Sequence, residues 1–510
     1  MENNNTGFRF AFMSRVFSFP IMCMFLLSVV IFAHCPGGIG IAETDIWWHL
    51  NDARVLLQHH SFSPIDIYSF SAAGTSWMDW EWLSEIPFFL AFNALGLQGL
   101  LLVNFAVVML IYAGVYYRSC RAGADPKDAV LTTVAAVFLG GAMLAPRTSL
   151  FGWLCMTALL LIMDRFGRTG KGLWLLPPLF ALWINLHGSW AFGMVVLAII
   201  IASGLVQGKY GLVVATRWST RDLKCLILVF FACSAAVFIN PFGYKLVFYP
   251  LDFQFRQKPI VQNVSYWHSV DFSARSGHLG LVLIFGLLAI ALFSSRPWKL
   301  KDVLLVAFAL WAALSHVRFL DFAAIVITPV IAPHLKLFPP YDRKQDKPWL
   351  NLVIMVGAVL ALVFLLPPEA KLQQKLESEL PKAALGFMQQ RQIQGNIFNC
   401  NEFGSYIEWT APQFKTFIDG REDLFVYAGV FDDYLRSVAI QDPQKIFDKY
   451  HIGYALLQND SSLGYFLAHS PQWRLLYSDQ VAVLFERVPA NDVAAESSAV
   501  DQGTKTLPRF

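Results

Sequence analysis

Eleven long stretches of apolar residues constrain this 510-residue chain more than any other feature of its sequence. A helix that crosses the hydrocarbon core of a membrane needs roughly 20 apolar residues, or somewhat fewer when its ends lie in polar protein. Only 15% of the residues are charged, whereas a soluble domain carries about 25%. The sequence therefore predicts a polytopic α-helical membrane bundle with about eleven transmembrane helices, near residues 16–34, 97–117, 128–145, 149–163, 173–186, 190–207, 224–239, 278–295, 302–315, 318–333 and 349–366.

The loops between these stretches form two alternating sets that differ strongly in basic residues. One set, which includes the N-terminus, holds 19 Lys and Arg residues, and the other holds only 7. Loops on the cytoplasmic side of a membrane are enriched in Lys and Arg, so the first set is predicted to be cytoplasmic. An odd number of helices then places the chain after about residue 367 on the outer side. The net charge of +3 gives no reason to expect a nucleic-acid partner.

The last 140 or so residues differ in character from the rest of the chain. Short β-prone runs alternate with helix-like stretches near 430–450 and 461–469, which is typical of a small α/β domain. We predict a transmembrane domain over 1–366 with a large outer loop at 34–86, an extracytoplasmic α/β domain over 367–490 and a disordered tail over 491–510. The expected strands are Asn396–Asn399, Tyr406–Trp409, Lys415–Ile418, Tyr454–Leu457, Trp473–Tyr477 and Val481–Arg487.

The large outer loop concentrates carboxylates next to tryptophans. It contains Glu43-Thr44-Asp45 before Trp47-Trp48-His49, and later Asp79-Trp80-Glu81-Trp82. Carboxylates two positions apart beside a membrane suit two uses. They can bind a divalent cation such as Mg²⁺ or Mn²⁺, or one of them can act as a general base on an acceptor hydroxyl. The tryptophans are open to two interpretations as well, an interfacial belt or a surface that stacks on sugar rings.

Other polar residues are predicted to lie on the same outer side, because they occupy turns between helices. A single charged residue at a helix end usually extends to the interface, so the argument for a site is collective. Arginines on this side can hold a phosphate by bidentate hydrogen bonds. The candidates for binding a carrier or substrate at these turns are Arg147, Asn185, His187, His316 and Arg318.

Two motifs in the C-terminal region each follow a β-like run. They are Asn401–Tyr406 and Ile418–Asp423, and the second contains Asp419, Gly420 and Arg421. Strand ends that carry Asp, Gly and Arg often form sites in α/β domains, so Asp419 and Arg421 are further binding candidates. The alternative is a structural turn, in which Gly404 and Gly420 supply a positive φ and Asp419 pairs with Arg421.

An acidic motif in the first outer loop, many helices and a C-terminal extracytoplasmic domain resemble the GT-C-type glycosyltransferases. Those enzymes use a polyprenyl-phosphate-linked sugar and carry a DxD or ExD motif in this loop, and Glu43-Thr44-Asp45 fits the ExD form. The wider pattern resembles a group of uncharacterised bacterial polytopic membrane proteins near that superfamily. It comprises ETDIWWHL, the P-x-D-x-Y-S-F stretch from Pro64, the E-W-L-x-E stretch from Glu81, Asn185-x-His187-Gly188 and Phe417–Arg421.

The sequence departs from that group at two positions. Glu43 stands where the group has Asp, and Tyr266 stands before Trp267 where a Glu is expected. The second departure puts a catalytic or metal-binding role of that outer segment in doubt.

The resemblance implies a membrane glycosyltransferase of a bacterial inner membrane. It would transfer a sugar from a polyprenyl-phosphate carrier to an unknown extracytoplasmic acceptor. Asp45 or Glu43 would be the general base or metal ligand, Asp79 and Glu81 would assist, and Arg147 or Arg318 would hold the carrier phosphate. Two alternatives remain, a transporter or lipid flippase, and a non-catalytic assembly protein. The sequence weighs against a transporter, since it has no inverted repeat and few ionisable residues in the middle of its helices.

Overall fold

The computed structural model describes residues 15–35, 44–141 and 145–488. The chain forms two compact units, which are described separately. The first unit comprises Met1–Ile39 and Trp80–Glu369, and the second comprises Gly40–Asp79 and Ala370–Phe510. Most of the loop predicted at 34–86 therefore belongs to the same unit as the C-terminal part of the chain. Glu43 and the predicted tail at 491–510 lie outside the described residues.

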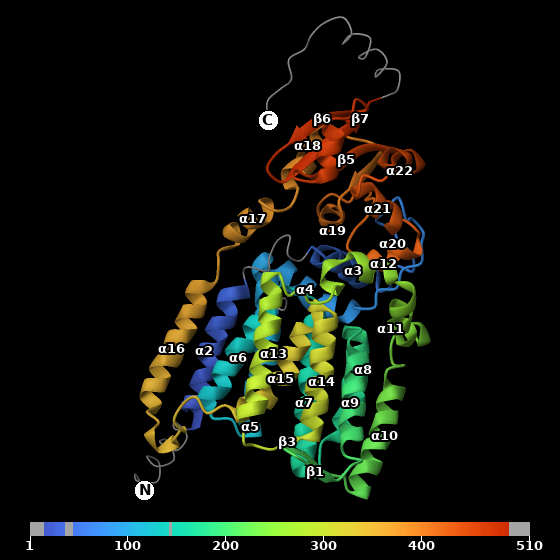
Figure 1. Cartoon of the computed structure of the whole chain (residues 1–510). Helices are drawn as coiled ribbons and strands as arrows, with labels where there is room; N and C mark the ends of the chain where they lie inside the picture. The colour runs from blue at the N-terminus through green and yellow to red at the C-terminus, as the bar shows by residue number, and fades with distance from the viewer. Residues whose placement is uncertain (1–14, 36–43, 142–144, 489–510) are drawn as a thin grey trace, which may run out of the picture. The chain divides into compact units, whose positions relative to one another are not determined.

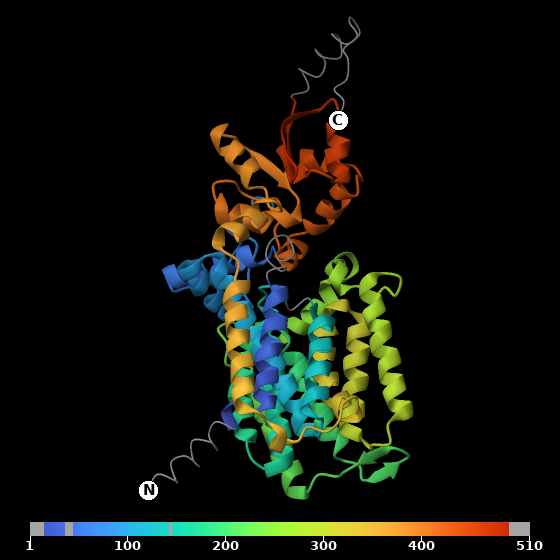
Figure 2. The same ribbon diagram turned by 90° about the vertical axis from the view of Figure 1, so that its left-hand side faces the viewer.

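The first unit is a bundle of helices that run side by side (Figures 1 and 2). Each of the eleven apolar stretches falls on a helix, and the region between the first two stretches contributes α4 (Trp82–Leu95) as a further apolar helix. The other helices of the unit are α2 (Phe19–His34), α5 (Leu97–Ala122), α6 (Pro126–Leu139), α7 (Ser149–Thr169), α8 (Leu176–Leu186), α9 (Trp190–Ser203), α10 (Thr220–Ala236), α11 (Tyr244–Arg256), α12 (Lys258–Asn263), α13 (Arg275–Phe293), α14 (Leu300–Ser315), α15 (Leu320–Ile331) and α16 (Pro348–Leu365).

The surface of this bundle is apolar, as a lipid-facing surface must be. Among the described residues, four helices are individually long and apolar enough to cross a membrane, and five shorter helices are also apolar. In α16 only 17% of the apolar window is buried, and Phe364 on this helix is 87% exposed. A monomeric soluble protein rarely exposes apolar patches of this extent to water. The apolar helices support a membrane location, while the number of eleven crossings stays a prediction.

The two ends of the bundle carry different residues. At one end lies a small sheet of β1 (Gly208–Tyr210), β2 (Val213–Ala215) and β3 (Trp298–Lys299) (Figure 1). Basic residues of the Lys- and Arg-rich loops make their contacts near this end: Arg118 pairs with Asp164 at 2.8 Å, and Arg296 donates to the carbonyl of Ala122 at 2.8 Å. The turns that hold Arg147, His187 and Arg318 lie at the opposite end.

The second unit contains a four-stranded sheet in the order β4-β5-β7-β6. The strands are β4 (Asn396–Asn399), β5 (Ile452–Gln458), β6 (Trp473–Ser478) and β7 (Ala482–Arg487). β4 is parallel to β5, and the other two pairings are antiparallel. The helices are α3 (Ile46–His59), α17 (Glu369–Glu377, whose first residue belongs to the first unit), α18 (Lys382–Gln390), α19 (Asn401–Thr410), α20 (Glu422–Tyr427), α21 (Phe431–Val438), α22 (Pro443–Lys449) and α23 (Ser462–Ala468).

Four of the six expected strands coincide with β4, β5, β6 and β7, and two do not. The run Tyr406–Trp409 lies in helix α19, where Phe403, Tyr406 and Ile407 are buried at the i, i+3 and i+4 spacing of one helix face. The run Lys415–Ile418 forms only an isolated parallel bridge, between Thr416 and Ser69.

Candidate active site

Three side chains from three different turns meet at one end of the first unit. Glu81 precedes α4, Thr148 precedes α7, and His187 lies between α8 and α9. Thr148 donates its hydroxyl hydrogen to Oε2 of Glu81 at 2.8 Å, and Nε2 of His187 lies 3.2 Å from Oε1 of Glu81. Both carboxylate oxygens are therefore held, and all three side chains are buried. Glu81 and His187 lie on the same side of the bundle, as the sequence predicts, and their side chains are in direct contact.

The hydrogen bonds of His187 fix its protonation. The backbone N–H of Ser189 donates to Nδ1 at 3.0 Å, so this nitrogen carries no proton. Nε2 is then the protonated nitrogen of the neutral ring and donates to Glu81. Burial lowers the pKa of His187 to about 3, and the charge of Arg318 acts in the same direction. At neutral pH the histidine is an uncharged hydrogen-bond donor.

Two arginines and an aspartate complete this polar cluster. Arg147 precedes α7, Arg318 lies between α14 and α15, and Asp321 is in the first turn of α15. Both arginines interact electrostatically with Asp321, and Arg318 also interacts with His187. Asp321 is 6% exposed, and its Oδ1 atom has no hydrogen-bond partner among the described residues. The cluster thus holds two cations near a single buried aspartate and a neutral histidine.

Stacking on aromatic rings orients Arg318. Its guanidinium carbon lies 4.0 Å from the centre of the Trp267 ring and 5.2 Å from that of Tyr266, within the range of a cation–π interaction. Nδ1 of His316 hydrogen-bonds to the carbonyl of Trp267, which anchors the same segment. Tyr266, the residue that departs from the expected Glu, therefore contacts an arginine of the cluster.

Asn185 has a structural environment. Its Oδ1 accepts from Nε1 of Trp82 at 3.1 Å, and its Nδ2 donates to the carbonyls of Ala181 and Ile239 at 2.7 and 2.8 Å. These bonds tie the start of α4 to the end of α8 and to the segment after α10. The role of Asn185 is therefore to position these turns.

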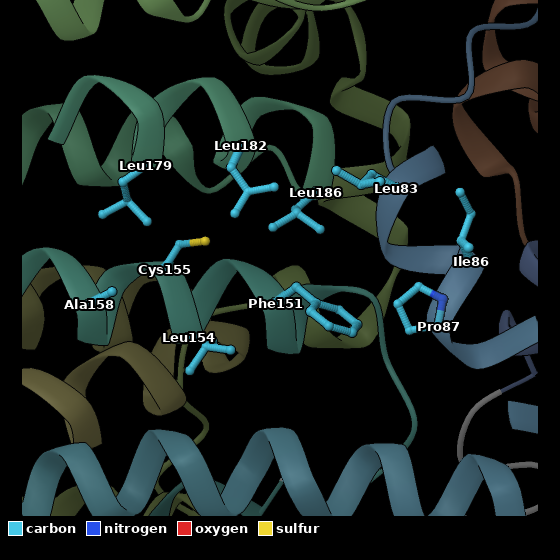
Figure 3. Close-up of a pocket in the computed structure, with 10 residues that line it drawn as sticks. All are labelled: Leu83, Ile86, Pro87, Phe151, Leu154, Cys155, Ala158, Leu179, Leu182 and Leu186. Atoms are coloured by element: carbon cyan, nitrogen blue, oxygen red, sulfur yellow. The ribbon is translucent and has the colours of Figure 1, made fainter. Parts of the chain in front are cut away.

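The first unit also contains an apolar cavity of about 480 Å³. It lies between α4, α7 and α8, and every side chain that lines it is apolar apart from the thiol of Cys155 (Figure 3). Leu83 is two residues from Glu81, and Leu186 is adjacent to His187. The lining residues are Leu83, Ile86, Pro87, Phe151, Leu154, Cys155, Ala158, Leu179, Leu182 and Leu186.

The second unit holds Asp45, at the start of α3. This carboxylate lies against the backbone of Gly420: a Cβ atom on Gly420 would be 2.0 Å from Oδ1 of Asp45 and 3.1 Å from Nε1 of Trp48. Because Glu43 lies outside the described residues, the predicted Glu43–Asp45 metal pair is not defined. The described residues contain no group of three or more His, Cys, Asp or Glu side chains that could hold a metal ion.

Asp79 lies in the same unit and is 5% exposed. It lines a small cavity of about 10 Å³ together with Asp52 and Trp77, which is about the space of one water molecule. Asp52 accepts hydrogen bonds from Nε1 of Trp77 at 3.0 Å and from the hydroxyl of Tyr68 at 2.9 Å. Burial raises the pKa of Asp52. These contacts fix the segment between α3 and the first unit.

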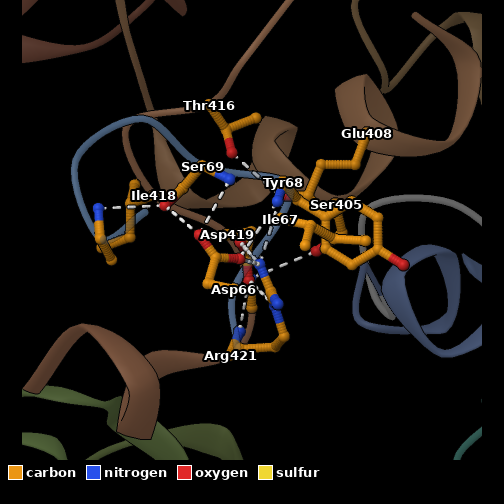
Figure 4. Close-up of polar contacts among 12 residues, drawn as sticks. Asp66, Ile67, Tyr68, Ser69, Ser405, Glu408, Thr416, Ile418, Asp419 and Arg421 are labelled. Atoms are coloured by element: carbon orange, nitrogen blue, oxygen red, sulfur yellow. Dashed lines mark hydrogen bonds and ion pairs between the residues drawn. The ribbon is translucent and has the colours of Figure 1, made fainter. Parts of the chain in front are cut away.

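Asp419 and Arg421 lie in a fully buried ion-pair cluster (Figure 4). Nη2 of Arg421 is 2.6 Å from Oδ2 of Asp419, 2.8 Å from Oδ1 of Asp66 and 3.7 Å from Oε1 of Glu408. Burial acts to raise the pKa of Asp419, but the charge of Arg421 outweighs it and the pKa is lowered. Burial raises the pKa of Glu408 well above its ordinary value.

The structural alternative for this motif is therefore correct in pairing Asp419 with Arg421. It is wrong in assigning a positive φ to Gly404 and Gly420. Neither Gly404 nor Gly420 is among the residues with a positive φ. A Cβ atom on Gly404 would lie 2.0 Å from the carbonyl oxygen of Ile418, so close backbone approach, not turn geometry, requires glycine at this position.

No protein-family profile matches this sequence, and no curated protein is detectably similar to it. Several solved structures share its fold. The apo oligosaccharyltransferase of Archaeoglobus fulgidus superposes with a TM-score of 0.52 at 10% identity, over 93% of this chain and 75% of that chain. ArnT of Cupriavidus metallidurans, bound to undecaprenyl phosphate, gives a TM-score of 0.51 at 10% identity, over 92% of this chain and 98% of that chain. This chain therefore has the same fold as these two proteins.

The shared fold confirms, at the level of fold, the resemblance that the sequence motifs indicate. At these identities the likeness concerns the fold alone. A third structure, the Archaeoglobus fulgidus enzyme with zinc and sulfate, superposes with a TM-score of 0.52 at 13% identity, over 92% of this chain and 74% of that chain.

Sequence reasoning missed four residues that the structure places beside the candidates. Thr148 is next to Arg147 in the sequence, and Asp321 is three residues after Arg318, so proximity in the turns was an available signal for both. The stacking of Trp267 on Arg318 joins residues from two separate loops, and the contact between Gly420 and Asp45 joins distant parts of the chain. No local pattern predicts these two contacts.

Proposed function

We propose that this protein transfers a sugar from a polyprenyl-phosphate carrier to an acceptor hydroxyl or amide on the outer face of a bacterial inner membrane. One observation carries the proposal most of all. An apolar cavity of about 480 Å³ is lined by Leu83 and Leu186, which lie within two residues of Glu81 and His187 in the chain, and His187 interacts electrostatically with Arg318. A polyprenyl phosphate has this same division, an apolar chain joined to an anionic group. The GT-C fold supports the same reaction class.

In this proposal the first unit binds the carrier. The isoprenoid chain occupies the apolar cavity, and Arg147 and Arg318 bind the phosphate by charge-assisted hydrogen bonds. Trp267 and Tyr266 keep the Arg318 guanidinium oriented. His187, uncharged near pH 7, donates its one N–H to Glu81 and so holds this carboxylate in place beside the arginines.

Asp45 is assigned as the general base, the role that its acidic motif implies. Asp45 removes the proton from the acceptor nucleophile, which attacks the anomeric carbon of the sugar. The bond between this carbon and the carrier phosphate oxygen breaks, and the electron pair leaves with the phosphate. The two arginines stabilise the negative charge that develops on this leaving group.

A divalent cation is the other use of the predicted Glu43–Asp45 pair. Mg²⁺ usually keeps several waters and binds through one or two carboxylates together with substrate phosphates. Asp45 by itself supplies one such ligand. We therefore assign the cation no step in the reaction.

Binding of undecaprenyl phosphate tests the carrier site. We expect Arg318→Gln to weaken binding about tenfold or more, because a hydrogen bond to a charged group is worth roughly 1.5–3 kcal/mol. We expect Ala158→Trp to weaken it as well, since the indole would fill the cavity. Native mass spectrometry of the purified protein in detergent measures both.

Two surface variants serve as matched controls in this binding test. Arg256→Gln removes an arginine whose side chain is 75% exposed and pairs only with Asp252 among its described ion pairs. Val282→Trp adds an indole at a position that is 69% exposed on α13. Equal affinity in all four variants and the wild type would refute the carrier site.

The orientation in the membrane is a separate prediction. The 19 to 7 distribution of basic residues predicts that a membrane-impermeant maleimide labels single cysteines introduced at Ser61 and Asp460 in intact cells. Cysteines at Arg121 and Lys344 should react only after the membrane is opened. All four positions are exposed, so access to the side chain itself does not limit labelling. Labelling at Arg121 in intact cells would reverse the orientation.

A further inference from the structure

The segment Thr416–Arg421, here called the support segment, runs along the residues that follow α3 in the second unit. The backbone N–H of Phe70 donates to the carbonyl of Thr416 at 3.0 Å. The hydroxyl of Ser71 donates to the carbonyl of Phe417. Residues more than 340 positions apart are therefore joined by backbone-directed hydrogen bonds, which fix the register of the two segments.

The support segment is itself held rigidly. Asn399, at the end of β4, accepts from the backbone N–H of Phe417 at 2.7 Å and donates to the carbonyl of Ile418 at 2.7 Å. Asn399 is fully buried, so these two bonds attach the support segment to the sheet. Arg421 then pairs with Asp66, and its guanidinium lies 4.9 Å from the ring centre of Tyr68 and 5.2 Å from that of Trp77.

Helix α3, which begins after Asp45, packs against α19 of the same unit. The rings of Trp47 and Tyr406 meet edge to face with centroids 5.3 Å apart. The guanidinium of Arg54 lies 4.7 Å from the ring centre of Trp409. α19 in turn approaches the support segment at Gly404, where no side chain separates the two backbones. The first turn and the middle of α3 are thus placed by residues of the C-terminal part of the chain.

Gly420 is the point at which this framework touches the carboxylate. Its missing side chain leaves the space that Oδ1 of Asp45 occupies, since a Cβ atom would lie only 2.0 Å away. Its backbone N–H donates to the hydroxyl of Ser405 at 3.2 Å, and Ser405 is fully buried in α19. Gly420 is not among the residues with a positive φ, so its backbone conformation does not require glycine. The contact with Asp45 excludes a side chain at this position.

We propose that the support segment positions Asp45 for the reaction, with Gly420 as the positioning residue in direct contact with it. The C-terminal part of the chain is then part of the catalytic apparatus and not a separate acceptor-binding module. This inference rests on the proposed function, in which Asp45 is the general base. A displacement of about 1 Å can cost a factor of about 10² in rate.

Gly420→Ala in the full-length protein tests this role. The added methyl group must displace Asp45, so we expect kcat for sugar transfer to fall about 10- to 100-fold. KM for the polyprenyl-phosphate donor should not change, because the donor site lies in other residues. Gly386→Ala is the matched control, since Gly386 belongs to the same unit and has open space where a Cβ would lie. This control should keep the wild-type kcat.

A double-mutant cycle separates positioning from a general structural effect. If Gly420 acts through Asp45, Gly420→Ala should cause no further loss in the Asp45→Asn background. An equal loss in both backgrounds would overturn the positioning role. Ser71→Ala, which removes one hydroxyl contact to the support segment, decides the question if Gly420→Ala does not fold. It should lower kcat several-fold in the wild type and not in Asp45→Asn.

The outcomes distinguish this inference from the function on which it rests. Wild-type kcat in both Gly420→Ala and Ser71→Ala, together with activity that depends on Asp45, overturns the positioning role and leaves the proposed function standing. A wild-type protein without transfer activity overturns both.

Discussion

Replacement of Asp45 by Asn is expected to lower the rate of sugar transfer about 10²–10⁴-fold while leaving expression and membrane insertion intact. Asn is nearly isosteric with Asp, so it fits the same space against Gly420 and Trp48. However, it cannot accept a proton from the acceptor. General-base assistance is typically worth about 10²–10⁴ in rate, and the transfer rate should fall by this factor. The initial rate of transfer from a labelled polyprenyl-phosphate sugar to the acceptor measures it.

The choice of control for this variant follows from the structure. Asp66→Asn is not neutral, because Asp66 pairs with Arg421 and accepts the hydroxyl hydrogen of Ser69 at 2.6 Å. Asp460→Asn is suitable, since Asp460 is an exposed turn residue of the same unit. It should keep the full transfer rate. Full activity in Asp45→Asn would show that the base has been assigned to the wrong residue.

Replacement of Arg421 by Met is expected to destabilise the second unit more than any other single change. It leaves Asp66 and Asp419 buried without their counter-ion, and loss of one partner of a buried ion pair costs about 3–5 kcal/mol. For a unit of this size this corresponds to a fall in the midpoint of thermal unfolding of roughly 6–20 °C. Tryptophan fluorescence during heating of the purified protein measures the midpoint.

The pH dependence of this effect has a definite sign. In the wild type the guanidinium lowers the pKa of Asp419, so the ion pair stabilises the fold above the ordinary pKa of Asp and is lost in strong acid. In Arg421→Met burial alone acts on the carboxyls and raises their pKa values. The difference between variant and wild type should therefore be larger at pH 8 than at pH 5. Arg436→Met, at an exposed position in α21, is the control. An unchanged midpoint in Arg421→Met would contradict a structural role of the cluster.

The sequence predicted the helices of the first unit well, because an apolar stretch in this setting has few alternatives to a helix. It failed where the local pattern was ambiguous. The run Tyr406–Trp409 contains residues that favour strands, yet it lies in helix α19, whose residues 403–408 are all buried. The pairing of Asp66 with Arg421 could not be predicted, since 355 positions separate the two residues.

The candidate site was predicted in part for a physical reason. Counting Lys and Arg in the loops placed the turns on one side, and Glu81, His187, Arg147 and Arg318 do gather at one end of the bundle. Asp321 lies just inside the apolar stretch 318–333, where hydropathy conceals a single acidic residue. A turn is one interpretation of Gly420 from the sequence alone. The sequence does not show which distant side chain needs the space beside a glycine.

Transfer by the purified protein in lipid vesicles tests the central claim most directly. The vesicles would contain polyprenyl phosphates that carry a set of labelled sugars, and an extract of the bacterial cell envelope would supply acceptors. We predict that at least one labelled sugar moves from the lipid to the acceptor fraction, and that polyprenyl phosphate is released in equal amount. Absence of transfer from every donor, combined with movement of a lipid or solute across the vesicle membrane, would contradict a glycosyltransferase and establish a transporter.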